Sequence, residues 1–193
     1  TRQATLFPYT TLFRSCHAMG AVWIFDNKDM TIIDIGGQDT KIICVEQGFV
    51  KDFMMNDKCS AGTGRFLEIM ANTLSMRPNE MCELAREGSG VTISSMCTVF
   101  AESEVISLIG QGEKKENIAF AVVDSIVRKV AAQANRMSED RPMLCLTGGL
   151  CECSYISEAL TKELGMEVKT DPQSRYAGAI GAALGAVKKG KKN

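Results

Sequence analysis

Two short apolar runs, each followed at once by a pair of glycines, are the feature of this sequence that most restricts its fold. Residues 31–35 (TIIDI) precede Gly36-Gly37, and residues 142–147 (PMLCLT) precede Gly148-Gly149. Apolar runs of this length that end at turn residues indicate buried strands. If the two strands are parallel neighbours, both glycine turns lie at the carboxyl edge of one sheet, where open α/β sheets bind ligands.

The other expected elements complete a mixed α/β sheet. Residues 41–46 and 49–54 are the next two strands, joined by a turn at Gln47-Gly48, so the first three strands form an antiparallel meander. Helices are expected at 62–76, from 78 to near 88, at 100–109 and at 116–137, and then a helix at 154–164, a strand at 166–170 and a helix at 173–189. This later alternation of helices and strands predicts parallel strands with crossover connections.

The helix expected at 116–137 carries a stripe of apolar residues at helical spacing, which predicts its buried face. On the same helix, Arg128 and Lys129 are expected to face solvent. The stripe consists of Ile118, Val122, Val123, Ile126, Val127, Val130 and Ala134.

Charge and cysteine content exclude several classes of protein. The 22 basic and 23 acidic side chains nearly cancel, so bulk charge gives no reason to bind nucleic acid or an anionic membrane. No apolar run approaches the ~20 residues of a membrane span, and no secretory leader is recognisable. We therefore expect a cytoplasmic protein, in which the eight cysteines are reduced and are structural thiols, metal ligands or reactive thiols rather than disulfides.

The first fifteen residues differ in composition from the rest. Residues 1–15 contain no acidic side chain, and the composition changes at Cys16. Part of this segment resembles translated sequencing-adapter read-through, and the alternative is a genuine exposed strand. We interpret residues 1–15 as non-native and residues 16–193 as the domain, with a further N-terminal half expected upstream.

The first glycine turn, residues 34–41 (DIGGQDTK), joins two strands and has neither the GxxxxGK[ST] nor the GxGxxG spacing. Gly36 and Gly37 allow close approach of a ligand to the backbone, whose amides can bind an anion. Asp34 and Asp39 are candidates for orienting Mg²⁺. Taken alone, the pattern is equally compatible with a plain hairpin.

Five segments in this order carry a specific resemblance. They are residues 34–41, 56–68 (NDKCSAGTGRFLE), 96–104 (MCTVFAESE), 146–150 (LTGGL) and 176–185 (YAGAIGAALG). The chain from Cys16 to Val187 resembles the ATPase activators of 2-hydroxyacyl-CoA dehydratases, a family that includes the ATP-binding subunits of benzoyl-CoA reductase. The resemblance implies the actin-like ATPase fold, which has two ribonuclease-H-like halves, and the expected strand order fits the second half.

The resemblance also implies roles for the glycine turns. Residues 34–41 correspond to the second phosphate loop, in which Gly36, Gly37 and Gln38 contact ATP, Asp34 binds Mg²⁺ and Gln38 positions the attacking water. Gly148 and Gly149 correspond to the adenosine loop. The first phosphate loop belongs to the other half and has no copy here. This chain alone is therefore expected to lack ATPase activity.

Cys59 and Cys97 each stand ahead of an expected helix, whose N-terminus favours a thiolate. From the residues alone, a small buried side chain near a helix cap is the preferred interpretation. The resemblance instead implies that these two cysteines from each of two subunits bind one 4Fe–4S cluster that bridges a homodimer.

The other six cysteines are interpreted as structural. Cys44 and Cys145 lie in expected strands, and Cys82 lies on a helix face. Cys151 and Cys153 could bind zinc, but no second pair at zinc spacing accompanies them. Cys16 lies beside His17, which is not expected to act as a lone ligand.

The resemblance implies an ATP-driven one-electron donor of anaerobic metabolism. Ferredoxin or flavodoxin would reduce the cluster, and the electron would pass to a 2-hydroxyacyl-CoA dehydratase. Two enzyme alternatives remain open: an ATPase subunit of a benzoyl-CoA-type reductase, and a metal-free actin-like kinase for a small molecule. A regulatory or structural role follows if the other half is absent in the cell.

Overall fold

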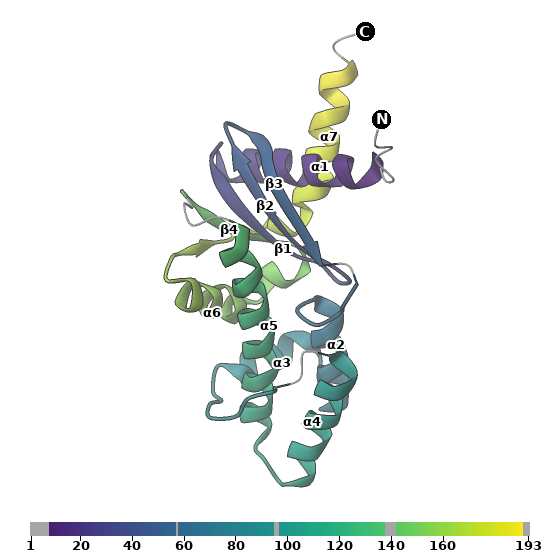
Figure 1. Cartoon of the computed structure of the whole chain (residues 1–193), viewed down its shortest axis with the longest axis vertical. Coiled ribbons are helices and arrows are strands. Elements are labelled where there is room, and N and C mark those ends of the chain that lie inside the picture. The colour runs from purple at the N-terminus through teal and green to yellow at the C-terminus, as the bar shows by residue number, and fades with distance from the viewer. Residues whose placement is uncertain (1–7, 57, 95–96, 138–141, 191–193) are drawn as a thin grey trace.

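The computed structural model describes residues 8–56, 58–94, 97–137 and 142–190 (Figure 1). Within these residues, five strands form one sheet in the order β3-β2-β1-β4-β5. The first three strands pair antiparallel, and β1, β4 and β5 pair parallel. This pattern confirms both the meander and the parallel pairing of the two strands that precede the glycine turns. The strands are β1 (Met30–Ile35), β2 (Thr40–Glu46), β3 (Phe49–Asn56), β4 (Leu144–Thr147) and β5 (Val168–Lys169).

Seven α-helices accompany the sheet in the described residues. They are α1 (Pro8–Phe25), α2 (Gly64–Thr73), α3 (Pro78–Ala85), α4 (Thr98–Gly110), α5 (Lys115–Met137), α6 (Ser154–Leu164) and α7 (Ala177–Gly190). Short 3₁₀ turns at Gly149–Glu152 and Ser174–Tyr176 precede α6 and α7. Several predicted boundaries were wrong. Helix α2 begins at Gly64 because Gly62 has a φ of +86° and Thr63 is extended, and β5 covers less than the predicted 166–170. Helix α4 begins at Thr98 rather than at 100, and α7 begins at Ala177 rather than at 173.

The sheet separates two apolar clusters because its side chains alternate between faces. On one face, Met30, Ile32 and Ile43 pack against Ala18 and Ala21 of α1. On the other face, strand residues pack against α2, α5 and α6, and the whole predicted stripe of α5 is buried in this larger cluster. Helices α2, α3, α4 and the first part of α5 extend away from the sheet as a helical lobe (Figure 1).

Lys129 does not face solvent, contrary to the sequence interpretation, whereas Arg128 is exposed as expected. The Lys129 side chain is half-buried, and its aliphatic part lies over Gly62, where an added Cβ would be 3.2 Å from Lys129 Cδ. Its Nζ donates a hydrogen bond to Cys59 Sγ at 3.6 Å. A long lysine side chain can therefore cover apolar surface and still deliver its charge to a specific acceptor.

Helices α1 and α7 cross on one side of the sheet with their backbones in close contact (Figure 1). A Cβ added at Gly20 would lie 1.8 Å from the Ala177 carbonyl oxygen, and one added at Gly181 would lie 1.7 Å from the Cys16 carbonyl oxygen. The small residues of α7 therefore allow the two helices to pack closely. Helix α1 includes residues 8–15, so the strand alternative is wrong for them; residues 1–7 lie outside the described part, and the non-native origin of 1–15 stays a prediction.

No helix in the described part of the chain combines the length and the apolar character that crossing a lipid bilayer requires.

Candidate functional site

The two glycine turns meet at the carboxyl edge of β1 and β4. Gly148 has a φ of +83°, and a Cβ placed on it would lie 2.5 Å from the Ile35 carbonyl oxygen. By contrast, no described atom lies within 4 Å of a Cβ placed on Gly37 or Gly149. One glycine of the second turn thus permits contact between the turns, while Gly37 and Gly149 leave open space in which a ligand can approach the backbone.

Asp34 is the buried centre of a polar cluster at this edge, with an exposed fraction of 2%. Thr147 Oγ1 donates to Asp34 Oδ1 at 2.9 Å, and Lys41 Nζ donates to Asp34 Oδ2 at 3.0 Å. Lys41 Nζ also bonds Asp39 Oδ1, and His17 Nε2 lies 3.4 Å from Asp34 Oδ2. The two carboxylates proposed for Mg²⁺ are therefore close together, with one lysine between them.

Three members of this cluster were not predicted from the sequence. Lys41 and Thr147 are the cross-strand partners of Asp34 in the two pairings of β1, so aligning the strands would have found both. His17 comes from α1, and no sequence signal indicates where that helix contacts the sheet.

Lys41 is charged at neutral pH in this setting. Burial disfavours its ammonium group, but the charges and hydrogen bonds of Asp34 and Asp39 outweigh burial and raise the pKa of Lys41 above the ordinary lysine value of 10.5. Two carboxylates and one ammonium leave a net negative charge beside the glycine turns. Such a charge suits a cation that accompanies an anionic ligand.

Helix α2 begins on the first glycine turn. The backbone N–H groups of Gly64 and Arg65 donate to the carbonyl oxygens of Gly36 and Gly37 at 2.9 and 2.7 Å. These bonds satisfy two amides that a helix N-terminus otherwise leaves unpaired. Gln38 is exposed beyond this contact at the tip of the turn, so its side chain is free to approach a ligand, and its catalytic role stays a prediction.

The loops that carry Cys59 and Cys97 are joined to each other. Ser60 and Thr98, which follow the two cysteines, share a hydrogen bond of 2.7 Å between their hydroxyl oxygens. Cys97 stands ahead of α4, as predicted, at its N-cap position. Its side chain is exposed, whereas the residues alone favoured a buried one. Cys59 is half-buried and lies four residues before Thr63, the N-cap residue of α2, so it precedes the helix without capping it.

The Cys59 loop is held from two further sides. Asn56 Nδ2 donates to the Cys59 carbonyl oxygen at 2.9 Å, and Lys129 places its ammonium group beside the sulfur. Among the described residues, no group of three or more His, Cys, Asp or Glu side chains could hold a metal. The described residues of one chain therefore offer two thiols on loops that a hydrogen bond joins, and not a complete tetrathiolate set.

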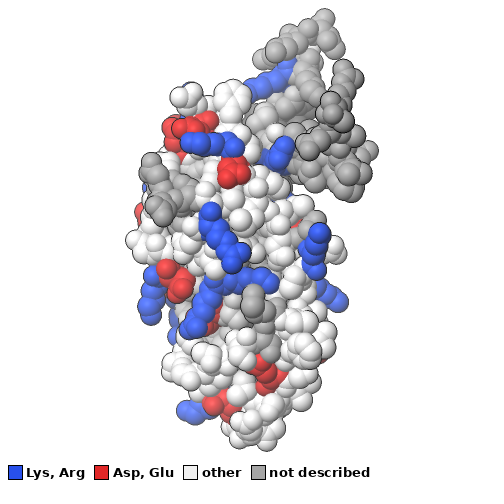
Figure 2. All heavy atoms as spheres, viewed as in Figure 1, with Lys and Arg blue, Asp and Glu red and all other residues white. Residues whose placement is uncertain are grey.

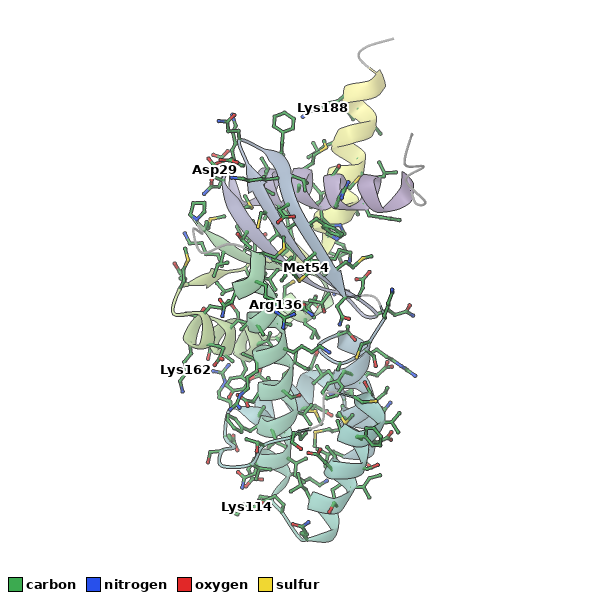
Figure 3. All side chains as sticks on the ribbon, in the orientation of Figure 1. Asp29, Met54, Lys114, Arg136, Lys162 and Lys188 are labelled. Atoms are coloured by element: carbon green, nitrogen blue, oxygen red, sulfur yellow. The ribbon has the colours of Figure 1, made fainter. Side chains whose placement is uncertain are left out.

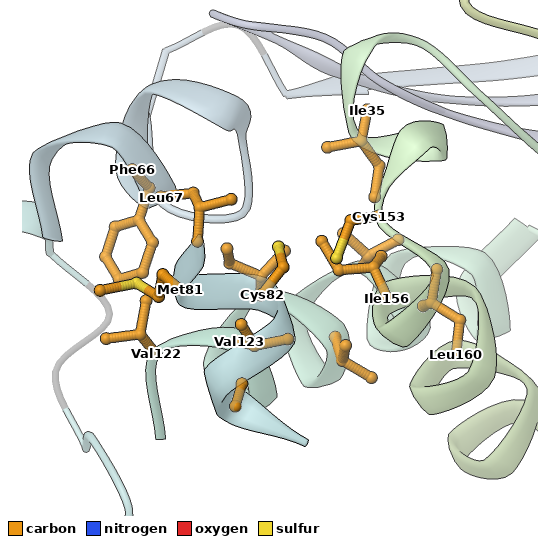
Figure 4. Packing of buried hydrophobic residues seen from close by; sticks show 14 of the residues in the cluster. Ile35, Phe66, Leu67, Met81, Cys82, Val122, Val123, Cys153, Ile156 and Leu160 are labelled. Atoms are coloured by element: carbon orange, nitrogen blue, oxygen red, sulfur yellow. The ribbon is translucent and has the colours of Figure 1, made fainter. Parts of the chain in front are cut away.

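The remaining six cysteines are all buried, as expected for structural thiols. Cys82 of α3 and Cys153, the N-cap residue of α6, face each other inside the larger apolar cluster (Figure 4). Their mutual hydrogen bond raises the pKa of Cys82, which burial raises further, and lowers the pKa of Cys153, which also accepts from backbone N–H groups at the start of α6. Burial raises the pKa of Cys151, so the two cysteines of the C-x-C pair have different environments.

Helix α4 presents apolar side chains to solvent directly after Cys97. The exposed residues are Val99, Phe100, Ile106 and Ile109. An exposed apolar group of this size beside a thiol pair is typical of a surface that another protein covers.

A mixed sheet of this order, with two glycine turns at the carboxyl edge of neighbouring strands, defines an ATPase domain of the actin-like fold. The chain belongs to the BadF/BadG/BcrA/BcrD ATPase family, whose model matches residues 6–186. The earlier resemblance and fold class are thereby confirmed. The similarity to MreB 5 of Spiroplasma citri, with 14% identity and a TM-score of 0.58, concerns the fold alone.

Relatives in this family include activating ATPases. The chain is 49% identical to the (R)-2-hydroxyglutaryl-CoA dehydratase activating ATPase of Acidaminococcus fermentans, over 92% of this chain and 68% of that protein. It matches the crystal structure of component A of that organism's dehydratase with 48% identity and a TM-score of 0.86, over 91% of this chain and 68% of the other.

A second solved structure is the activator of the 2-hydroxyisocaproyl-CoA dehydratase from Clostridium difficile with bound ADPNP. Its identity to this chain is 39% and its TM-score 0.86, over 92% of this chain and 66% of the other. The chain thus spans about two thirds of the length of the relatives it matches.

Proposed function

We propose that this chain is the cysteine-bearing, nucleotide-binding part of an ATP-dependent activator that supplies single electrons to a 2-hydroxyacyl-CoA dehydratase. Membership of an ATPase family and the similarity to dehydratase activators support this proposal. Because the chain spans about two thirds of those relatives, ATP hydrolysis is assigned to this domain together with a partner half that supplies the first phosphate loop.

At the nucleotide site, Gly36, Gly37 and Gln38 contact the phosphates, while Gly148 and Gly149 contact the adenosine. Asp34 and Asp39 orient Mg²⁺ and its water ligands, and Gln38 positions the attacking water. Lys41 holds both carboxylates in place in the absence of the cation, since its ammonium group bonds to each of them. A bound cation would give these carboxylates a further positive partner.

At the thiol pair, Cys59 and Cys97 are the ligands for one half of a 4Fe–4S cluster, and a second copy supplies the other half. Such a cluster stores and releases one electron at a time. The chain contributes positive potential at this place: Lys129 Nζ lies beside the Cys59 sulfur, and Cys97 stands at the N-cap position, next to the positive end of α4. Both features stabilise negative charge on the thiolates. The exposed apolar residues of α4 fit contact with the second copy or with the dehydratase.

The observation that carries the proposal is a continuous series of hydrogen bonds between the two sites. The Gly36-Gly37 turn accepts from the first amides of α2, Thr40 Oγ1 donates to the Gly62 carbonyl oxygen at 2.6 Å, and Ser60 bonds Thr98 beside Cys97. A ligand that shifts the glycine turn thereby shifts both cysteine loops. In this way nucleotide binding can bias an element with two arrangements.

The two thiols and the similarity to dehydratase activators favour the proposed function over the kinase and reductase alternatives. A metal-free small-molecule kinase gives no reason for two neighbouring thiols near the surface. A benzoyl-CoA-type reductase would use the same residues. The 49% identity to a dehydratase activator favours activation of a dehydratase over reduction of an aromatic ring. We assign ferredoxin or flavodoxin as the electron source, and the cytoplasm of an anaerobe as the location, because reduced thiols need a reducing compartment.

Anaerobic purification with iron and sulfide analysis tests the proposal. We expect about four iron and four sulfide per two chains, with an electron paramagnetic resonance signal after reduction by dithionite. Cys59→Ser and Cys97→Ser should each abolish iron binding and dimer formation, while the buried Cys44→Ser serves as the matched control. A colourless, iron-free protein, or a cluster that survives both substitutions, contradicts the proposal.

A further inference from the structure

A pocket of about 360 Å³ opens between the loop before α2 and the outer side of α5. None of the four turn glycines lines it, so it is separate from the nucleotide site. Its volume lies at the lower end of the range for small-molecule sites. Ala61, Phe66 and Ile93 form its apolar wall.

The charged residues of the pocket are all basic. Arg128, Lys129 and Arg136 line it, and no carboxylate among the residues that the structure describes does. Figure 2 shows basic side chains gathered in the middle of this face, and Figure 3 places Arg136 near the end of α5 that approaches the sheet. Arg128 Nε is paired with Asp124 at 2.8 Å, and the Lys129 ammonium group bonds Cys59, whereas Arg136 has no ion pair within the described part of the chain. The pocket therefore favours an anion and leaves Arg136 available to bind it.

One neutral polar group in the pocket lacks a partner. Gln133 Oε1 is buried, and no donor among the described residues bonds it. A buried acceptor without a donor is unfavourable, and native structures rarely keep one without a reason. A ligand with an O–H or N–H group would supply the missing bond.

These features together define the ligand. An anionic group is needed for Arg136, a hydrogen-bond donor for Gln133, and a carbon body for the apolar wall. The donor has to be neutral, since an ammonium group would be repelled by the neighbouring cations. We propose that this pocket binds a small hydroxy acid with an apolar side chain, its carboxylate at Arg136 and its hydroxyl group donating to Gln133.

The proposal is independent of the cluster, because none of the residues that contact the ligand is assigned to the thiol pair or to the glycine turns. Titration calorimetry with three matched probes tests it in the presence of excess ADP, which occupies the nucleotide site. Phenyllactate has the required hydroxyl group, hydrocinnamate lacks it, and phenylalanine carries an ammonium group in its place. Phenyllactate should bind about tenfold more tightly than hydrocinnamate. Phenylalanine should bind most weakly.

Two variants distinguish the contacts. Gln133→Met should remove the preference for phenyllactate over hydrocinnamate and leave hydrocinnamate binding unchanged. Arg136→Gln should weaken both acids, and Lys115→Gln, at an exposed position at the other end of α5, should weaken neither. Thermal melting of each variant shows whether it is folded.

Several results would overturn the proposal. They are equal affinity for phenyllactate and hydrocinnamate, tightest binding of phenylalanine, a hydroxyl preference that survives Gln133→Met, and the absence of binding at millimolar concentration.

Discussion

The backbone N–H of Arg65 donates a 2.7 Å hydrogen bond to the carbonyl oxygen of Gly37. This bond attaches the first turn of α2 to the candidate phosphate turn. A second bond, from Gly64 to Gly36, runs beside it, so the helix that follows the Cys59 loop moves together with that turn. Main-chain hydrogen bonds therefore link the proposed nucleotide site to the helix that follows Cys59.

Gly64→Ala tests this attachment. A Cβ at Gly64 would lie 3.2 Å from the Gly36 carbonyl oxygen and 3.3 Å from Gly37 Cα, so the methyl group pushes α2 away from the turn. We expect ADP affinity to fall several-fold, measured by calorimetry. The matched control is Gly110→Ala, a helical glycine with open space around it, which should stabilise the protein by up to about 1 kcal/mol. Equal ADP affinity in the two variants would contradict the attachment.

Gly148→Ala tests the contact between the two turns. The added methyl group would meet backbone at 2.5 Å, and the residue would keep an unfavourable φ of +83°. The expected loss in the free energy of unfolding is about 3 kcal/mol, measured by urea denaturation. Gly149→Ala adds the same methyl group in open space and should cost less than about 1 kcal/mol. The interpretation fails if the neighbouring substitutions have the same effect.

Lys41→Met tests the buried polar cluster through pH. The pKa of Lys41 is raised in the folded protein, so its stabilising contribution is fully present below pH 10.5 and is lost as the pH rises through the higher folded value. At neutral pH the variant leaves Asp34 without its ammonium partner, which should cost about 3 kcal/mol or more. The difference in the free energy of unfolding between wild type and variant should shrink above pH 10.5.

Two further variants check the assignment to this ion pair. Asp34→Asn together with Lys41→Met should recover part of the lost stability, because the uncompensated charge is then absent. The exposed Lys115→Met should show no such dependence on pH. A constant difference between wild type and Lys41→Met from neutral pH to pH 11 would be evidence against the pairing.

Ser60→Ala and Thr98→Ala test the link between the cysteine loops. Each removes one partner of the 2.7 Å hydrogen bond and should cost about 1 kcal/mol of stability. The double variant should cost little more than either single variant, since the same bond is lost. If the cluster is present, all three variants should lose iron to a chelator faster than wild type. Ser103→Ala, whose hydroxyl group bonds only within α4, is the control and should leave the rate unchanged.

Local pattern was sufficient to predict most elements and the meeting of the glycine turns. The short apolar runs of β1 and β2, which end at turn residues, identify buried strands, and the stripe of α5 identifies its buried side. Contacts between segments that are distant in the sequence could not be predicted in this way. Nothing in the local sequence around Lys129 shows that Gly62 leaves room for its aliphatic chain, or that Cys59 lies within its reach.

The same distinction holds within the candidate site. The two glycine pairs could be predicted as site residues, because a glycine pair directly after a strand has few structural uses. They are Gly36, Gly37, Gly148 and Gly149. His17 and the bond between Ser60 and Thr98 depend on how helices dock, which periodicity does not determine.

The close crossing of α1 and α7 has a practical consequence for shortening this protein. The two helices come from opposite ends of the described chain, and at Gly20 and Gly181 their main chains touch with no room for a side chain. Deleting α1 would expose the isoleucine and methionine side chains of the sheet that it now shields from water, and deleting α7 would uncover the face of α1 that carries Gly20. Any trimmed version intended for expression therefore needs both helices, and α1 also carries His17 to the polar cluster around Asp34.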